Sequence, residues 1–420
     1  MKIVRLFFVA LLFYIYCFSL VFTFFPISTK ILLEGAGLLY VLVKLSSGKF
    51  KLKKEFVWVF KYSIFLLIWD SLLSVVSGYF QFHFFELIKT PIGSIFAAGL
   101  MFEISKKLLK TEKDFLLFFI FIVFSECALT ILMNMMPSLF DLVMRIQITD
   151  MGNKEVTDIE GYYRMIGIGS AVYFGVLPVC AFALLSCSYL INSRLAKSFS
   201  MAYVIIAFLT IGVAYFFSAR TSLAIVAIAA IPLLINLKSI GVKNLIVFGV
   251  VFLLAVFVGV NYIENNFNDS MLEWAFGFMV DKESSNSVVS VLSWWQNTDF
   301  TPLTFLIGDG CYENPDGTYY QHVDVGWFRI IFYCGVIGLM MILFFHYKLS
   351  QFIYKCKKSK EMLLMLVLLF VCYAIILAKG DATLLTFLIL FLVYYKGGVF
   401  ERRNEYKVKQ QINTHNYEIQ

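Results

Sequence analysis

The sequence predicts an all-α, polytopic integral membrane protein. Three observations indicate this class: 60% of the 420 residues are hydrophobic, only 15% are charged, and the mean hydropathy is +0.81. A soluble core of this length could not bury so much apolar surface. A helix that crosses ~30 Å of hydrocarbon needs ~20 mostly apolar residues, and the chain contains about twelve such segments. We expect membrane spans near residues 6–25, 31–45, 56–77, 88–104, 115–133, 166–191, 199–217, 221–237, 244–262, 328–347, 361–379 and 382–396.

The cationic residues are distributed unevenly between the predicted loops. With a cytoplasmic N-terminus, 25 of the 35 Lys and Arg residues face inward, as the positive-inside rule requires. The first apolar segment is bulky and lacks a small-residue cleavage site, so we interpret it as a retained span. We therefore expect one transmembrane domain over residues 1–420, with both termini in the cytoplasm and a basic cytoplasmic tail over residues 397–420.

Charge and motifs exclude several classes of function. The net charge of +7 is mostly inner-face charge that sets topology, so we expect contact with membrane lipid and none with nucleic acid. The chain contains no CxxC, HExxH, Walker or Rossmann motif, so we expect no metal or nucleotide cofactor. Only Cys311 of the eight cysteines lies in a predicted outer loop, which excludes a disulfide framework.

Two predicted outer loops are long, and long structured loops tend to carry function. The first covers residues 134–165; its stretch "PSLFDLVMRI" predicts a short interfacial helix. The second covers residues 263–327 and carries ten Asp or Glu residues against Lys282 alone. Its aromatic-rich apolar stretches "MLEWAFGFMV" and "SVVSVLSWW" predict further interfacial helices. Carboxylates mixed with aromatic residues suit sugars, which offer hydroxyl donors and apolar ring faces. A solvated acidic loop explains the charge about as well.

Arginine is concentrated on the predicted outer side. It supplies four of the nine outward cations but only four of the 25 inward ones, and the outward four are Arg145, Arg164, Arg220 and Arg329. Topology needs only positive charge, whereas a planar guanidinium grips phosphate oxygens in a bidentate way. A phosphate-bearing ligand would explain the preference, and interfacial snorkelling is the alternative.

The "SARTS" hairpin holds Arg220 between two spans at the outer membrane boundary. The hydroxyls of Ser218, Thr221 and Ser222 can cap the second helix there. A helix N-terminus together with a guanidinium predicts an anion site.

Three motifs then suggest a family: the "SARTSL" hairpin, "YYRMIGIGS" at the end of the first long loop, and "FLIGDG…HVDVGWFRIIFYCGVIG" at the end of the second. With the number of spans, they give a chain that resembles Wzy-type O-antigen or capsular repeat-unit polymerases, whose wider family includes O-antigen ligases. The resemblance implies a GT-C-like fold in the bacterial inner (cytoplasmic) membrane, with the active site on the periplasmic face.

The resemblance also implies a reaction. A growing glycan would pass from undecaprenyl diphosphate to the terminal sugar of another lipid-linked repeat unit, without a nucleotide. Donor and acceptor would both be lipid-linked oligosaccharides, and a chain-length regulator and a flippase are possible partners. Arg164 and Arg329 would bind the diphosphate, with Arg220 as a third candidate.

The remaining candidate residues lie near Arg329. His322 or Asp324 is the best-placed general base for the attacking hydroxyl, and a metal site there is a weaker interpretation because no third ligand is evident. Further candidates, which would bind sugar, are Asp309, Glu313 and Trp327, and the two carboxylates are also weaker base candidates.

Two alternatives stay open. An O-antigen ligase of the same family would have a similar topology, and His322 is followed by Gly335 and Gly338 in a looser match to the ligase spacing. A twelve-span flippase for lipid-linked oligosaccharides would need ionisable residues within its spans. The sequence offers some, at Glu34, Asp70, Glu103 and Glu126.

Overall fold

The structure is a computed structural model. It describes residues 2–47, 54–78, 80–81, 83–148, 167–169, 177–193, 195, 199–219, 221–235, 301–314, 318–323, 325–356, 358–378, 388–389 and 392.

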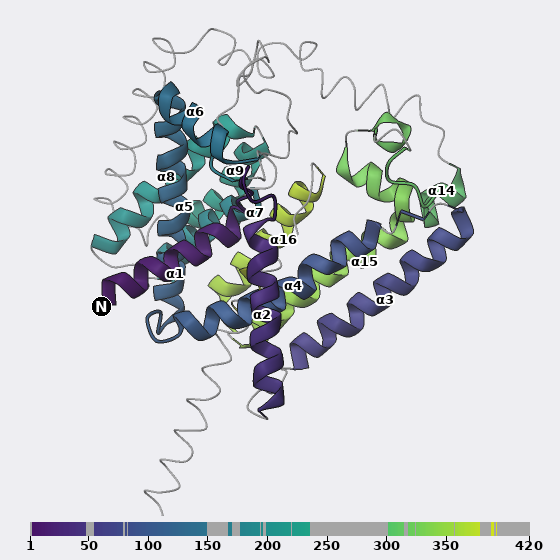
Figure 1. Cartoon of the computed structure of the whole chain (residues 1–420), viewed down its shortest axis with the longest axis horizontal. Helices are drawn as coiled ribbons and strands as arrows, with labels where there is room; N and C mark the ends of the chain where they lie inside the picture. The colour runs from purple at the N-terminus through teal and green to yellow at the C-terminus, as the bar shows by residue number, and fades with distance from the viewer. Residues whose placement is uncertain are drawn as a thin grey trace, which may run out of the picture.

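The described residues form helices and no β-strand (Figure 1). The α-helices are α1 (Lys2–Cys17), α2 (Thr29–Ser46), α3 (Lys54–Ser77), α4 (His83–Ser105), α5 (Glu112–Met135), α6 (Pro137–Ile146), α7 (Leu177–Asn192), α8 (Phe199–Ser218), α9 (Thr221–Ile235), α14 (Pro302–Ile307), α15 (Gly326–Cys356) and α16 (Lys360–Leu377). A short 3-10 turn, η3 (Tyr320–His322), precedes α15.

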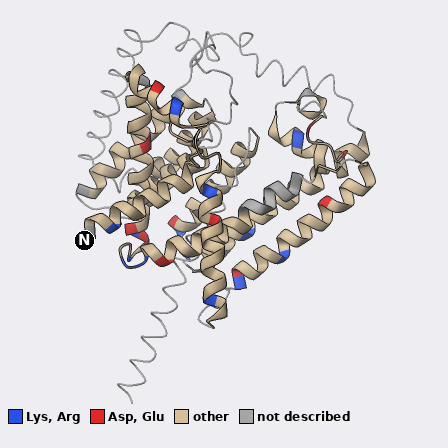
Figure 2. Cartoon of the chain, viewed as in Figure 1, with Lys and Arg blue, Asp and Glu red and all other residues tan. Residues whose placement is uncertain are grey.

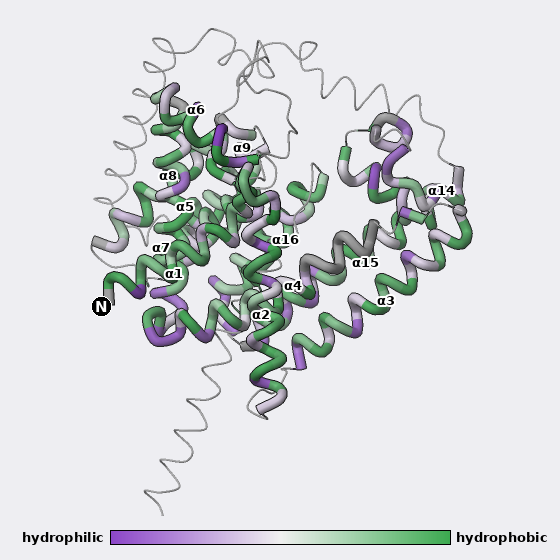
Figure 3. Tube along the Cα trace, viewed as in Figure 1, coloured by the Kyte–Doolittle hydropathy of each residue, from purple (hydrophilic) through white to green (hydrophobic). Residues whose placement is uncertain are grey.

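The helices are those of a membrane-embedded protein. In the described part of the chain, α3, α5, α15 and α16 are long and apolar enough to cross a membrane, and several further apolar helices are shorter. Hydrophobic residues dominate the helices (Figure 3), and charged residues occupy few positions on them (Figure 2). Helix α3 exposes large apolar side chains such as Ile64 and Leu72, while it buries Ser63, Asp70 and Ser74. Helix α3 therefore presents large apolar side chains outward, as lipid requires, and keeps its carboxylate Asp70 inside the protein.

Most predicted spans coincide with a helix, but several ends were wrong. The span expected to end at residue 347 belongs to α15, which continues to Cys356. The first span was expected to reach residue 25, but α1 ends at Cys17 because Ser19 adopts a positive φ of 50°. The span expected from residue 166 contains the non-helical residues 167–169, and α7 begins at Leu177. The expected span at 244–262 and almost all of that at 382–396 lie outside the described residues, as do the expected interfacial helices before residue 301 and the basic tail.

The predicted helix "PSLFDLVMRI" is confirmed over its full length as α6. Pro137 lies in its first turn, where the missing N–H costs nothing. No residue of α6 is buried. Backbone hydrogen bonds from Thr23 to Ile146 (2.9 Å) and from Ile148 to Val21 (2.8 Å) attach its end to the segment between α1 and α2.

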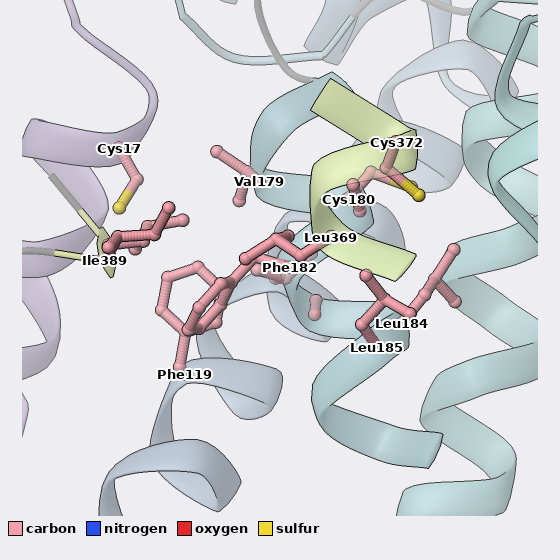
Figure 4. Packing of buried hydrophobic residues seen from close by; sticks show 14 of the residues in the cluster. Cys17, Phe119, Val179, Cys180, Phe182, Leu184, Leu185, Leu369, Cys372 and Ile389 are labelled. Atoms are coloured by element: carbon pink, nitrogen blue, oxygen red, sulfur yellow. The ribbon is translucent and has the colours of Figure 1, made fainter. Parts of the chain in front are cut away.

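The core is centred on α7, whose residues are buried without interruption from Leu177 to Ile191. A helix that is apolar all round needs neighbours on every side, and α7 packs against α5, α8, α9 and α16. In Figure 4 the side chain of Phe182 lies between Phe119 of α5 and Leu369 of α16. The rings of Phe119 and Phe182 meet edge-on with centroids 5.2 Å apart.

Candidate functional site

The motifs "LIGDG" and "FYCG" fold against each other at the start of α15. Helix α14 begins after Thr301, whose hydroxyl accepts a hydrogen bond from the Thr304 N–H. It ends at Gly308, with a φ of 85°. The N–H groups of Asp309 and Gly310 then donate to the carbonyls of Phe332 (2.5 Å) and Tyr333 (3.0 Å).

Those bonds are needed because α15 is broken at Gly335, which has φ 67° and ψ −179°. A helix end leaves carbonyl groups without intrahelical partners, and the "GDG" loop satisfies two of them. A side chain at Gly335 would overlap the carbonyl oxygen of Leu306 in α14. The first part of α15, residues 326–334, is thus a separate short helix, whereas the sequence predicted one continuous span.

Arg329 lies on this short helix and is buried, with 6% of its surface exposed. Its guanidinium carbon lies 3.8 Å from the ring centre of Tyr319 and 5.6 Å from that of Tyr312. A cation over an aromatic face gains about 2 kcal/mol or more when desolvated. A snorkelling arginine would extend into the interface, so the burial of Arg329 disagrees with that alternative.

The predicted sugar-binding residues have different environments. The Asp309 carboxylate accepts hydrogen bonds from the Thr304 hydroxyl (2.7 Å) and the Tyr320 hydroxyl (3.4 Å), so it holds the loop. Glu313 is exposed. Trp327 is 41% exposed, and its indole N–H donates to the Ala374 carbonyl at the end of α16 (2.9 Å).

The loop is also tied to the segment between α3 and α4. The Gln81 side-chain oxygen accepts hydrogen bonds from the N–H groups of Tyr312 (2.6 Å) and Glu313 (3.1 Å). Cys311, between Gly310 and Tyr312, is buried, and its thiol donates to the Glu313 carbonyl (3.3 Å). Burial raises the pKa of the Cys311 thiol, and the negative charge of Asp309 adds to the rise.

Three of the candidate residues, Arg164, Arg220 and Asp324, lie outside the described residues. The backbone of His322 ends η3, after Gln321 with a positive φ of 55°, but its side chain is not among the described ones. Arg329 lies one turn into the next helix, α15. His322 and Arg329 therefore lie on either side of the junction between the loop and α15.

The segment that follows Arg164 is anchored in the core by Glu126. Glu126 is 3% exposed and accepts hydrogen bonds from the Ile168 N–H (2.9 Å), the Thr130 hydroxyl (3.2 Å) and the Tyr14 hydroxyl. A side chain at Gly167 would overlap the Glu126 carboxylate. The "GIG" stretch therefore lies in a cradle formed by Glu126, Thr130 and the Phe18 carbonyl, and at Gly169, with a φ of 135°, that carbonyl leaves room only for glycine.

The "SARTS" hairpin contains two buried hydroxyls next to Arg220. Ser218 donates back into α8, to the Ala214 carbonyl (3.2 Å). Within the described part of the structure, the hydroxyls of Ser222, fully buried at the start of α9, and of Tyr215, near the end of α8, have no hydrogen-bond partner. Buried polar groups are normally satisfied by protein, water or ligand.

Several residues of the site were not predicted. Tyr312 and Tyr319 flank Arg329, and the Tyr333 hydroxyl donates to Asp70, a fully buried carboxylate of α3. The tyrosine-rich stretches "GCYE" and "GTYYQH" were a visible signal, because aromatic residues near an outward arginine can stack on it. Among the described residues, no group of three or more His, Cys, Asp or Glu side chains could hold a metal ion.

Comparison with known proteins assigns no relative. The chain matches no protein-family model, and no curated protein and no solved structure is significantly similar to it.

Proposed function

We propose that the chain is a polysaccharide repeat-unit polymerase of the bacterial inner membrane. It would transfer a growing glycan from undecaprenyl diphosphate to the terminal sugar of a second lipid-linked repeat unit on the periplasmic face. The observation that carries this proposal is Arg329, a buried guanidinium stacked on Tyr319 at the junction of a long acidic loop and a broken apolar helix.

The environment of Arg329 suits a diphosphate leaving group. Stacking uses the face of a guanidinium, whereas an anion binds its N–H edge, so both interactions can coexist. Burial lowers the local dielectric and strengthens attraction to developing negative charge. Irregular backbone at the broken helix is tolerated in a membrane only where protein or a polar cavity covers it, and ligand sites use such breaks.

The reaction would proceed at the anomeric carbon of the donor. The acceptor hydroxyl oxygen forms a new bond to that carbon, the bond to the diphosphate oxygen breaks, and the lipid diphosphate leaves with the electron pair. His322 or Asp324 would accept the hydroxyl proton. Arg329, with Arg164 and Arg220, would stabilise the charge on the leaving group.

The sugars would lie along the acidic loop. The exposed Glu313 carboxylate and the exposed face of Trp327 suit a sugar's hydroxyls and ring. Asp309 is engaged by Thr304 and Tyr320, which favours a supporting role for it. The buried hydroxyl of Ser222, which lacks a partner in the described part of the chain, supports a polar ligand at the "SARTS" hairpin.

The carboxylates within the spans bear on the flippase alternative. A carrier would use them along an ion path. In the described structure Glu34, Asp70 and Glu126 each accept a hydrogen bond from a tyrosine of another helix, and Glu103 pairs with Lys106 at 2.6 Å. This arrangement favours anchoring of helices over ion transport.

Deletion of the gene in its own host, followed by gel electrophoresis of surface glycan, tests the proposal. A polymerase predicts glycan capped at a single repeat unit. Polymer that accumulates on the undecaprenyl carrier but is missing from the lipid core would indicate a ligase. Single units trapped on the cytoplasmic side would indicate a flippase. Either of the last two results would overturn the proposal.

A further inference from the structure

A fully buried carboxylate, Asp70, lies beside the site without a part in the reaction described above. It occupies α3 two turns before the helix ends at Ser77. A buried carboxylate in an apolar span is costly unless hydrogen bonds compensate it. One group that donates a hydrogen bond to it is the hydroxyl of Tyr333, which is itself 1% exposed.

Tyr333 connects Asp70 to Arg329. The two residues of α15 are four positions apart, so they lie on the same side of the short helix. The ring of Tyr333 meets that of Tyr312 edge-on, with centroids 6.2 Å apart, and Tyr312 in turn flanks the Arg329 guanidinium at 5.6 Å. The Tyr333 carbonyl is held by the Gly310 N–H at 3.0 Å.

The short helix needs such a fastening because of the break at Gly335. An unbroken helix would fix Arg329 relative to the rest of α15, but the rotation at Gly335 interrupts the hydrogen-bond ladder. The position of residues 326–334 must therefore come from lateral contacts. One is at the N-terminus, where the Gly326 N–H donates to the Ala378 carbonyl (2.8 Å). Near the break, the "GDG" loop holds the backbone carbonyls of Phe332 and Tyr333, and Asp70 holds the side chain of Tyr333.

We propose that Asp70 is a positioning residue that, through the Tyr333 hydroxyl, holds Arg329 in place for a diphosphate-linked lipid. This inference rests on the proposed function for the identity of that lipid. The role needs an acceptor oxygen at Asp70 and does not need its charge. Asparagine also supplies an acceptor oxygen, so D70N should preserve the position of Arg329. Leucine supplies none, so D70L should not.

The test uses the purified full-length protein in lipid nanodiscs. One assay follows polymer formation from lipid-linked single repeat units, and the second measures the affinity for undecaprenyl diphosphate alone. Loss of one buried hydrogen bond predicts a fall of about tenfold in kcat/KM and in diphosphate affinity for Y333F and D70L. D70N should stay within about threefold of the unchanged protein, since a neutral acceptor still bonds the phenol.

A combined variant separates positioning from general support of the fold. If Tyr333 acts through Arg329, then Y333F should add no further loss of affinity to R329K. If Tyr333 only supports the fold, the affinity losses of Y333F and R329K should multiply in the double variant. Y333F should then also lower the melting temperature, with or without R329K.

The outcomes distinguish this inference from the proposed function. Equal affinity for diphosphate in Y333F, D70L and the unchanged protein would overturn the inference. A D70N variant as defective as D70L would also overturn it, because the charge of Asp70 would then be essential. If the unchanged protein binds diphosphate but makes no polymer, the proposed function fails while the affinities still decide the role of Asp70. Absence of diphosphate binding would overturn both.

Discussion

Replacement of Gly335 by alanine tests whether the break in α15 builds the site. At φ 67° and ψ −179° the backbone occupies a region that only glycine adopts readily. A β-carbon would also overlap the Leu306 carbonyl. The backbone strain alone costs on the order of 1–3 kcal/mol, and the overlap adds to it. G335A should therefore separate α14 and its loop from α15.

Cys311 is a local reporter of that separation. Its thiol is buried between α14 and η3, and burial raises its pKa, so it reacts slowly with alkylating reagents. A destabilisation of about 1–3 kcal/mol raises the open population, and with it the labelling rate, by roughly 5- to 150-fold. The rate of maleimide labelling at Cys311 would be measured by peptide mass spectrometry on the purified protein.

Gly35 provides the matched control. It lies within helix α2, and a β-carbon there would meet no atom within 4 Å. G35A should leave the labelling rate unchanged and stabilise α2 by ~0.5–1 kcal/mol. Equal labelling rates in G335A and the unchanged protein would refute the broken helix.

Further substitutions test the other parts of the site. R329K should lower polymer production at least about tenfold at equal membrane abundance, because an ammonium lacks the planar fork. The control R145K, on the exposed end of α6, should leave polymer production unchanged. Equal losses in the two variants would indicate a nonspecific effect. E126L should lower the melting temperature by removing three hydrogen bonds. E126Q keeps an acceptor for the Ile168 N–H and should lower the melting temperature less. A larger fall in E126Q than in E126L would count against the anchoring of residues 167–169 by Glu126. S222A should reduce diphosphate affinity without loss of thermal stability, since in the described part of the chain that hydroxyl has no partner to lose; unchanged affinity would remove Ser222 from the site.

The sequence predicts an all-helical, membrane-embedded protein and the helix α6 well because both depend on local composition. A hydropathy window detects apolar content, and after Pro137 the polar residues Ser138, Asp141 and Arg145 recur every three or four positions, which indicates an amphipathic helix after α5. The same window cannot detect a change in backbone rotation. The break at Gly335 and the bend at Gly169, with φ 135°, therefore lay hidden inside predicted spans.

The supporting residues of the site depend on contacts between distant parts of the chain. Asp70 and Tyr333 are separated by 263 positions, and Tyr14 and Glu126 by 112. The sequence placed these carboxylates within predicted spans without showing their partners. Arg329 was predicted from its residue type and its predicted side of the membrane, which are local properties, but its stacking on Tyr319 depends on the fold of the loop between them.

The most direct measurement is reconstitution of the purified protein with lipid-linked single repeat units and no nucleotide. A polymerase predicts a ladder of lipid-linked glycans, with one undecaprenyl diphosphate released for each unit added, and R329K should suppress the ladder. Unchanged single units would contradict the central claim if the acceptor and donor are intact. Glycan transfer that occurs only when lipid core is added would contradict it in favour of a ligase.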